Sequence, residues 1–286
     1  MEANELLKKV RKIEIRTRKL SQQIFSGEYH SAFKGLGMAF SEVRQYHYGD
    51  DTRFIDWNVT ARFNHPYVKI FEEERELTVM LLIDVSGSNL FGTRVREKSE
   101  LITEIAAVLA FSAIHNNDKV GVIFFSDKVE KFIPPKKGRS HILRVIMDLL
   151  TFEPESTRTN AGEAFRYLTN AIKKRCTAFV LSDFLNTDFE QPLKIAANKH
   201  DVIALNIADK GEFQLPDTGL MYLHDPETQQ QLLVDTSDPV VRKSYEQWWR
   251  KQQSGIDTLW QKLGIHAGHF YTDEDYVKGL IALFRR

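Results

Sequence analysis

The sequence predicts an α/β protein built on a doubly wound, mostly parallel sheet that is flanked by helices. From residue 77 to the C-terminus, short apolar runs alternate with segments of helical period, which is the pattern of strand–helix–strand units. The first run, "LTVMLLID" at residues 77–84, is almost continuously apolar, as in a strand that is covered on both faces. The chain has 286 residues, of which 42% are hydrophobic, and this is sufficient for the core that such a sheet requires.

The strands are predicted from apolar runs that end in turn-forming or acidic residues. They cover residues 77–84, 119–127, 128–135, 177–183, 201–209 and 266–272. Helical periodicity predicts helices at 95–117, 138–150, 161–175, 188–199, 238–263 and 273–286. Asparagines at the end of the first helix and Asp273 at the start of the last suit helix caps. A small hairpin insertion is expected near 216–236, with its turn at Asp225 and Pro226.

The first 76 residues are expected to form an N-terminal region that precedes the domain at 77–286. Residues 1–24 favour a basic, loosely amphipathic helix, because their leucine, valine and isoleucine side chains recur at helical spacing. Residues 26–76 show no clear period and end in an extended stretch, "YVKIFEEERE". We therefore expect one helix followed by an irregular, strap-like extension.

The composition argues against several classes of function. Lysine plus arginine and aspartate plus glutamate number 39 each, so the zero net charge gives no argument for nucleic-acid binding. The basic N-terminal helix is expected to be solvated, with contact to an acidic partner or to a membrane surface as the alternatives. The single cysteine, Cys176, permits neither an intramolecular disulfide nor a cysteine-based zinc cluster. No apolar run approaches the roughly 20 residues of a membrane span, and the charged start of the chain lacks a signal-peptide pattern, so a cytoplasmic protein is expected.

Acidic and hydroxyl-bearing residues lie where the predicted strands end. The stretch "LLIDVSGSNL" at residues 81–90 carries Asp84, Ser86 and Ser88 out of a buried strand. In an extended loop, these alternate positions would direct their oxygens to the same side. A helix cap needs one such residue and not three. We therefore interpret Asp84, Ser86 and Ser88 as metal ligands.

Two further segments are expected to reach the same edge of the sheet, because ligands of open α/β sheets bind at the carboxyl ends of the strands. Asp183 closes the strand "TAFVLSD", and the loop "STRTNAG" offers Thr157 and Thr159. Carboxylate and hydroxyl oxygens suit a hard cation such as Mg²⁺ or Mn²⁺. Because hydroxyl ligands are neutral, the ion would stay electrophilic and keep positions open to an outside carboxylate.

This combination of residues resembles the metal-ion-dependent adhesion site (MIDAS) of von Willebrand factor A domains. The similar features are "DVSGS", a threonine in a later loop and an aspartate after a later apolar strand. The resemblance implies that Asp84, Ser86 and Ser88 bind Mg²⁺ directly or through water, that Thr159 joins them in some states, and that Asp183 acts mostly through water. The stretch "STRT" departs from the Gly-Gly-Thr of the family, so Thr157 is a competing candidate.

A second stretch of the sequence points to one particular family. It covers residues 46–76 and reads "YHYGDDTRFIDWNVTARFNHPYVKIFEEERE". With "FKGLGMAFSEVRQY" before them, they closely resemble a bacterial family catalogued as domain of unknown function fifty-eight, and the likeness covers nearly the whole chain. Members are often encoded beside MoxR-type AAA+ ATPases, which implies a partner role in assembly or chaperone-like activity. Within this stretch, the charged and aromatic residues either fix a strap onto the sheet or form a docking surface for the partner. The candidate docking residues are Arg53, Asp56, Trp57 and Arg62.

The main enzymatic alternative is a Mg²⁺-dependent phosphohydrolase, because one class of these enzymes also has an aspartate directly after an apolar strand. That chemistry needs a second aspartate two residues later as general acid, and Ser86 occupies this position. The expected function is therefore a non-enzymatic protein-interaction module. Its cation would bridge to a carboxylate on a protein partner, either an AAA+ ATPase or a client of that ATPase.

Overall fold

The computed structural model of the protein describes residues 10–11, 13–15, 17, 39–72, 77–92, 96–185 and 188–284. Contacts within the chain divide it into two units, Met1–Ala32 with Thr78–Arg286 and Phe33–Leu77. The expected N-terminal region of residues 1–76 is therefore split, because its first part groups with the α/β domain and its second part is a unit of its own.

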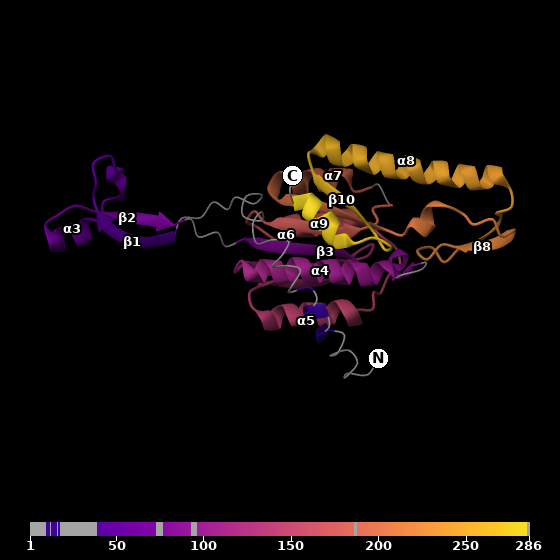
Figure 1. Ribbon diagram of the computed structural model, residues 1–286, viewed down its shortest axis with the longest axis horizontal. Helices are drawn as coiled ribbons and strands as arrows, with labels where there is room; N and C mark the ends of the chain where they lie inside the picture. The colour runs from indigo at the N-terminus through magenta and orange to yellow at the C-terminus, as the bar shows by residue number, and fades with distance from the viewer. Residues whose placement is uncertain are drawn as a thin grey trace. The chain divides into compact units, whose positions relative to one another are not determined.

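The larger unit contains a six-stranded sheet with the order β10-β7-β6-β3-β4-β5 (Figure 1). All neighbouring strands are parallel except β4 and β5, which form an antiparallel hairpin. The strands are β3 Thr78–Asp84, β4 Lys119–Phe125, β5 Val129–Lys136, β6 Thr177–Ser182, β7 Asp201–Ala208 and β10 His266–Tyr271. This arrangement confirms the predicted doubly wound, mostly parallel sheet.

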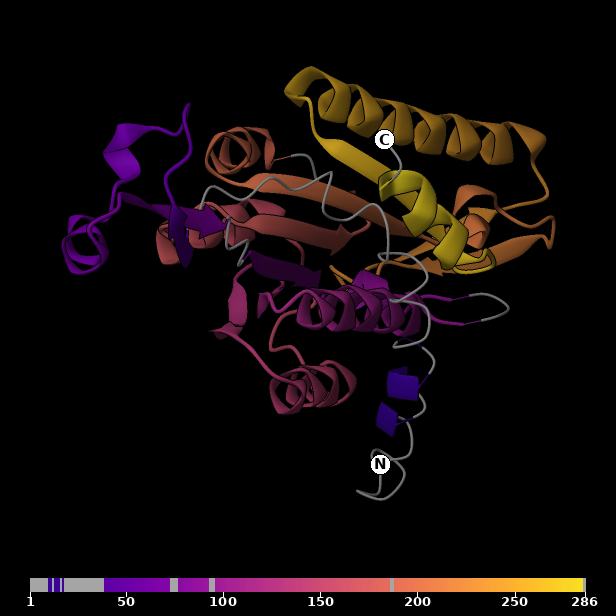
Figure 2. The same ribbon diagram turned by 60° about the vertical axis from the view of Figure 1, so that its left-hand side comes forward.

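Helices cover both faces of this sheet. They are α4 Lys98–His115, α5 Arg139–Thr151, α6 Ala161–Ala171, α7 Glu190–Lys199, α8 Pro239–Leu263 and α9 Tyr276–Phe284. In Figures 1 and 2, α4 and α5 lie on one side of the sheet and α8 lies on the other. The cap predicted for the last helix is wrong by two residues, because Asp275, and not Asp273, accepts a hydrogen bond from the N–H of Val277.

Strand β3 is buried on both faces, which explains its continuous apolar sequence. Met80 and Leu82 belong to a cluster of buried side chains that includes residues of α6, α7 and α8. Val79, Leu81 and Ile83 alternate with them and point to the opposite face, and none of these five side chains is more than 1% exposed. Burying a side chain of this size contributes roughly 1.5–3 kcal/mol.

The predicted hairpin insertion is present as β8 Leu220–His224 and β9 Gln231–Asp235. The two strands pair with each other in a two-stranded antiparallel sheet that is separate from the six-stranded one. Their turn contains Asp225 and Pro226, as predicted, and the short helix η3 Lys210–Phe213 precedes the hairpin.

The smaller unit has more regular structure than the sequence analysis expected. Strands β1 Ala39–Gln45 and β2 Tyr67–Glu72 form an antiparallel pair, and the helices η1 Thr52–Phe54 and α3 Trp57–Phe63 lie between them in sequence. Asp56 caps α3, because its side chain accepts hydrogen bonds from the N–H groups of Asn58 and Val59. The aspartates of this stretch therefore organise its turns.

Most of the helix predicted at residues 1–24 lies outside the described residues, but residues 10–11, 13–15 and 17 are helical. Val10, Glu14 and Thr17 are buried. The guanidinium Nε of Arg139 in α5 donates to Glu14 Oε1 at 2.6 Å. These residues therefore dock on the α/β unit. Across the part of the chain that the structure describes, no helix combines the length and the apolar character that crossing a membrane requires.

Candidate metal-binding site

The candidate site lies at the carboxyl ends of β3 and β6, which are neighbours in the middle of the sheet. Asp84 is the last residue of β3, and Asp183 directly follows β6. Beyond Asp84 the N–H of Val85 donates to the carbonyl of Phe125 at 2.9 Å, and the chain then enters the short helix η2 Gly87–Leu90. The parallel pairing of β3 and β6 thus brings two carboxylates from distant parts of the sequence to one edge.

Asp84 is held on both of its carboxylate oxygens. The N–H of Ser86 donates to Oδ1 at 2.9 Å, and the hydroxyl of Ser182 donates to Oδ2 at 2.6 Å. The side-chain amide of Asn89 donates to the carbonyl of Asp84 at 2.9 Å, which fixes the backbone as well. Asp84 is only 1% exposed. The carboxylate is therefore rigidly placed below the protein surface.

Ser86 and Ser88 lie beside this carboxylate, as the sequence predicted, although the loop is a short helix and not extended. Their hydroxyl oxygens are 3.1 Å apart, and both residues are buried. Ser86 occupies the N-cap position of η2, but its side chain makes no capping hydrogen bond. The capping interpretation therefore does not account for Ser86, whose hydroxyl faces Ser88 and Asp84 instead.

The two candidate threonines differ in burial and in partners. Thr159 is buried, and its hydroxyl donates to Glu227 Oε1 at 2.7 Å. Thr157 is exposed, and its hydroxyl donates to the carbonyl of Glu227 at 3.0 Å. The carbonyl of Thr157 accepts from the N–H of Gly87 at 2.8 Å, which ties this loop to the segment between Ser86 and Ser88. Its burial makes Thr159 the better candidate.

Asp183 forms a buried ion pair that sequence reasoning did not anticipate. The ammonium Nζ of Lys98 lies 3.1 Å from Asp183 Oδ2 and 2.7 Å from Glu212 Oε1. Lys98 is the first residue of α4, Glu212 belongs to η3, and the lysine side chain is 0% exposed. Lys98 therefore compensates the charges of Asp183 and Glu212.

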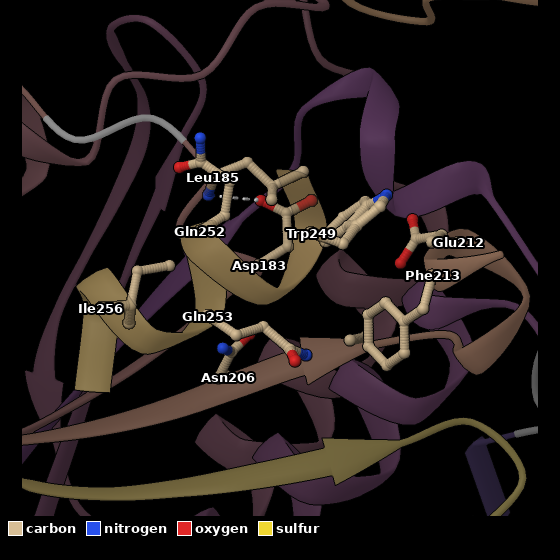
Figure 3. A pocket seen from close by; sticks show the side chains of 10 residues that line it. Asp183, Leu185, Asn206, Glu212, Phe213, Trp249, Gln252, Gln253 and Ile256 are labelled. Carbon is tan, nitrogen blue, oxygen red and sulfur yellow. Dashed lines mark hydrogen bonds between the residues drawn. The ribbon is translucent and has the colours of Figure 1, made fainter. Parts of the chain in front are cut away.

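A small pocket adjoins Asp183 on the side of α8 (Figure 3). Its polar wall includes Asp183, Asn206 and Glu212, and Phe213 and Trp249 contribute apolar surface. The second oxygen of Asp183 accepts a long hydrogen bond from the N–H of Leu185 at 3.4 Å, drawn as a dashed line in Figure 3. The pocket thus gives Asp183 a partly polar environment.

Electrostatics distinguish Asp84 from the other acidic groups. Burial, with a further contribution from the nearby charge of Asp183, raises the pKa of Asp84 to about 7, although hydrogen bonds from Ser182 and Ser86 act in the opposite direction. Burial also raises the pKa of Glu212, and the charge of Lys98 opposes that rise. Burial alone would lower the pKa of Lys98, but Asp183 and Glu212 outweigh it and raise that pKa. Among the described residues, Asp84 has no ion-pair partner.

The donor set fits a hard divalent cation. A buried carboxylate without a cationic partner, next to two serine hydroxyls, is an environment in which a bound cation would relieve an unfavourable charge. Within the described ranges, no group of three or more His, Cys, Asp or Glu side chains could hold a metal ion. A metal at this edge of the sheet would therefore depend on the hydroxyl oxygens as well as on Asp84 and Asp183.

The four predicted docking residues lie in the smaller unit. Arg53 forms an ion pair with Asp51, and Asp56 pairs with Lys69 in addition to capping α3. Trp57 is 70% exposed, and Arg62 is exposed as well.

The fold and the site together define a class of protein, an α/β domain that presents oxygen donors at the central strand ends of its sheet. Within this class, the chain belongs to the family described as "Protein of unknown function DUF58", which matches residues 42–255. The predicted family membership is thereby confirmed.

The sequence relatives cover most of this chain, and the similar structures cover between about half and three quarters of it. An uncharacterized protein of Mycobacterium tuberculosis is 27% identical over 276 residues, which cover 95% of this chain and 86% of that protein. The structure is similar to the conserved hypothetical protein BatB from Bacteroides thetaiotaomicron, with 18% identity, a TM-score of 0.47, and coverage of 73% of this chain and 97% of that one. It is also similar to the VWA domain of SpRpn10, with 15% identity, a TM-score of 0.33, and coverage of 47% and 76%. The fold assignment rests on the strand order and the covering helices, and not on these scores.

Proposed function

We propose that this protein is a non-enzymatic, metal-dependent protein-interaction module. Mg²⁺ or Mn²⁺ would bind to Asp84, Ser86 and Ser88, with Thr159 and Asp183 close by. The observation that supports this proposal most strongly is the buried Asp84 carboxylate, which has two serine hydroxyls beside it and no cationic partner among the described residues. A cation there would attract a carboxylate of a partner protein.

The surrounding residues have separate tasks in this proposal. The N–H of Ser86 and the hydroxyl of Ser182 orient the Asp84 carboxylate. Lys98 holds Asp183 in place and neutralises it, so that the region does not carry an excess of negative charge. With mainly neutral hydroxyl donors, a bound ion would keep much of its positive charge for an outside ligand.

The partner is proposed to be a MoxR-type AAA+ ATPase or its client, as implied by the family resemblance, and a cytoplasmic location remains a prediction. The alternative of a Mg²⁺-dependent phosphohydrolase lacks its general acid, because a serine hydroxyl at position 86 does not supply a proton at neutral pH as a carboxylic acid does. Turnover of a phosphomonoester that requires Mg²⁺ and is lost in Asp84→Asn would favour this alternative.

A pull-down with a purified MoxR-type AAA+ ATPase from the same organism tests the proposal. The purified protein should capture the ATPase in Mg²⁺ and release it in EDTA, and Asp84→Asn should capture none. The matched control is Asp127→Asn, because Asp127 follows the end of β4 much as Asp183 follows β6. Equal capture by Asp84→Asn and by the wild type would contradict a metal-dependent interaction.

The same pull-down tests the predicted docking surface. The exposed Trp57 side chain makes Trp57→Ala suitable, since the substitution removes little buried surface. Reduced capture by Trp57→Ala, with unchanged metal dependence, would support docking through residues 53–62.

A further inference from the structure

The turn of the β8–β9 hairpin lies directly against the loops of the proposed metal site. A Cβ atom added at Gly87, between the two serines, would lie 2.7 Å from the carbonyl oxygen of Pro226, so only glycine permits this approach. The hydroxyl of Thr157 donates to the carbonyl of Glu227 at 3.0 Å. The turn therefore packs on the segment that carries Ser86 and Ser88 and on the loop that carries Thr159.

The side chain of Glu227 extends from this turn to Thr159. The hydroxyl of Thr159 donates to Glu227 Oε1 at 2.7 Å, and its N–H donates to Oε2 at 3.3 Å. Among the described residues, no lysine, arginine or histidine forms an ion pair with Glu227, and the nearby charge of Asp183 is of the same sign. A carboxylate thus approaches a proposed metal ligand, and no cation in the described ranges compensates its charge.

The turn holds Glu227 in a defined position. The carboxylate of Asp225 accepts hydrogen bonds from the N–H of Glu227 at 2.9 Å and from the hydroxyl of Thr228 at 2.6 Å. The N–H of Gln229 closes the turn by donating to the carbonyl of Asp225 at 2.8 Å. The hairpin therefore presents Glu227 to the site in an organised conformation.

We propose that Glu227 is an internal carboxylate ligand of this metal site, in the position that a partner's carboxylate would take. This inference rests on the proposed function and adds a way in which binding of the partner would be regulated. The hairpin caps the site of its own chain, and a partner that offers an aspartate or glutamate side chain must displace Glu227. A divalent cation beside Asp84 would also offset the like-charge effect of Asp183 on Asp84 and on Glu227.

The construction of the hairpin is compatible with displacement. In the described part of the chain its two strands pair only with each other, so the turn can leave the site without breaking a ladder of the six-stranded sheet. Isolated two-stranded hairpins are marginally stable. The face that carries Leu220, Tyr222 and Leu233 is largely exposed, so it contributes little packing to hold the hairpin in place.

Binding of Mn²⁺, followed by electron paramagnetic resonance of the free ion, tests this inference. Glu227→Gln keeps the shape of the side chain and removes its charge, so the dissociation constant for Mn²⁺ should rise about 10-fold. Addition of sodium acetate should partly restore the affinity of Glu227→Gln, because a free carboxylate can take the vacated position. Acetate should leave the wild type unchanged. The matched control is Glu153→Gln, an exposed glutamate on the segment that leads to Thr157, which should bind Mn²⁺ like the wild type.

The outcomes separate this inference from the proposed function. Equal Mn²⁺ affinity of Glu227→Gln and wild type, with no effect of acetate, would overturn the internal ligand while the metal site remained. Failure of the wild type to bind Mn²⁺ more tightly than Asp84→Asn would overturn the proposed function and this inference with it.

Discussion

Lys98 is a fully buried lysine whose ammonium group lies between the carboxylates of Asp183 and Glu212. Removing one partner of a buried ion pair leaves an uncompensated charge and typically costs about 3–5 kcal/mol. Lys98→Met should therefore lower the free energy of unfolding by about 3 kcal/mol or more, as measured by urea denaturation. Lys128→Met is the matched control, because the ion pair of Lys128 with Glu155 is solvent-exposed and its loss should have little effect. A Lys98→Met protein as stable as the wild type would show that the pair is dispensable.

The buried side chain of His200 should make the free energy of unfolding depend on pH. The residue is 1% exposed, and its Nδ1 lies 3.3 Å from the sulfur of Cys176. Burial, followed by the charge of Lys199, lowers its pKa to about 4 from an ordinary value of 6.5. Because the folded state disfavours the proton, the contribution of His200 is complete above about pH 6.5 and declines as the pH falls toward 4. From pH 6.5 to pH 5 the loss should be about 2 kcal/mol.

The measurement is the free energy of unfolding of wild type and His200→Gln at several pH values in this window. The difference between the two slopes isolates His200 from the carboxylates, which titrate in both proteins. Parallel curves would mean that His200 takes up its proton equally well in the folded and unfolded states.

Local sequence patterns decided which site residues were predictable. Asp84, Ser86 and Ser88 lie within five positions, so their alternation at a strand end could be noticed. Ser182 precedes Asp183 and was detectable by the same reasoning. Lys98 and Glu227 reach this region from the start of a helix and from a hairpin turn. Their contacts follow from the tertiary fold alone, and no local pattern indicates them.

At the scale of elements, the strands of the central sheet were predictable because burial on both faces demands continuous apolar runs. The pair β1 and β2 was not, since its two strands are separated by Tyr46–Pro66 and the seven-residue helix α3 between them is too short for a clear period. The bounds of α9 shifted because Asp275 and not Asp273 accepts the capping hydrogen bond. Which of several nearby acidic residues caps a helix depends on the backbone turn, because the turn decides whose carboxylate can accept from an N–H group of the first helical turn.

Two glycines in different elements should respond to alanine in opposite ways. Gly255 is an exposed residue inside α8 with nothing within 4 Å of an added Cβ atom, so Gly255→Ala should stabilise the protein by about 0.5–1 kcal/mol. At Gly87 the added Cβ atom would lie 2.7 Å from the carbonyl oxygen of Pro226, so Gly87→Ala should destabilise by about 1–3 kcal/mol or displace the hairpin turn. Thermal unfolding of both variants measures the contrast. A Gly87→Ala protein as stable as Gly255→Ala would argue against the close contact of the turn with the serine loop.

At the scale of the whole molecule, the strand order places β3 and β6 side by side in the middle of the sheet. This topology is what brings Asp84 and Asp183 to one edge. The organisation of residues 33–77 as a separate unit was not predictable. Its exposed aromatic and charged side chains do not recur at the spacing of a helix or a strand, so the sequence does not show which of them pack together. The identity of a binding partner likewise depends on surface side chains, and the spacing of apolar residues in the sequence predicts only the buried elements.

The central claim, a divalent cation at the carboxyl ends of β3 and β6, is tested most directly by Mg²⁺ titration of the melting temperature. A dissociation constant of about 1 mM, at roughly 10 mM Mg²⁺, corresponds to about 1.4 kcal/mol of stabilisation. For a domain of this size, the melting temperature should rise by about 2–5 °C. The rise should be retained in Asp127→Asn and lost in Asp84→Asn. An equal rise in Asp84→Asn, or no rise in the wild type, would contradict a cation site at Asp84.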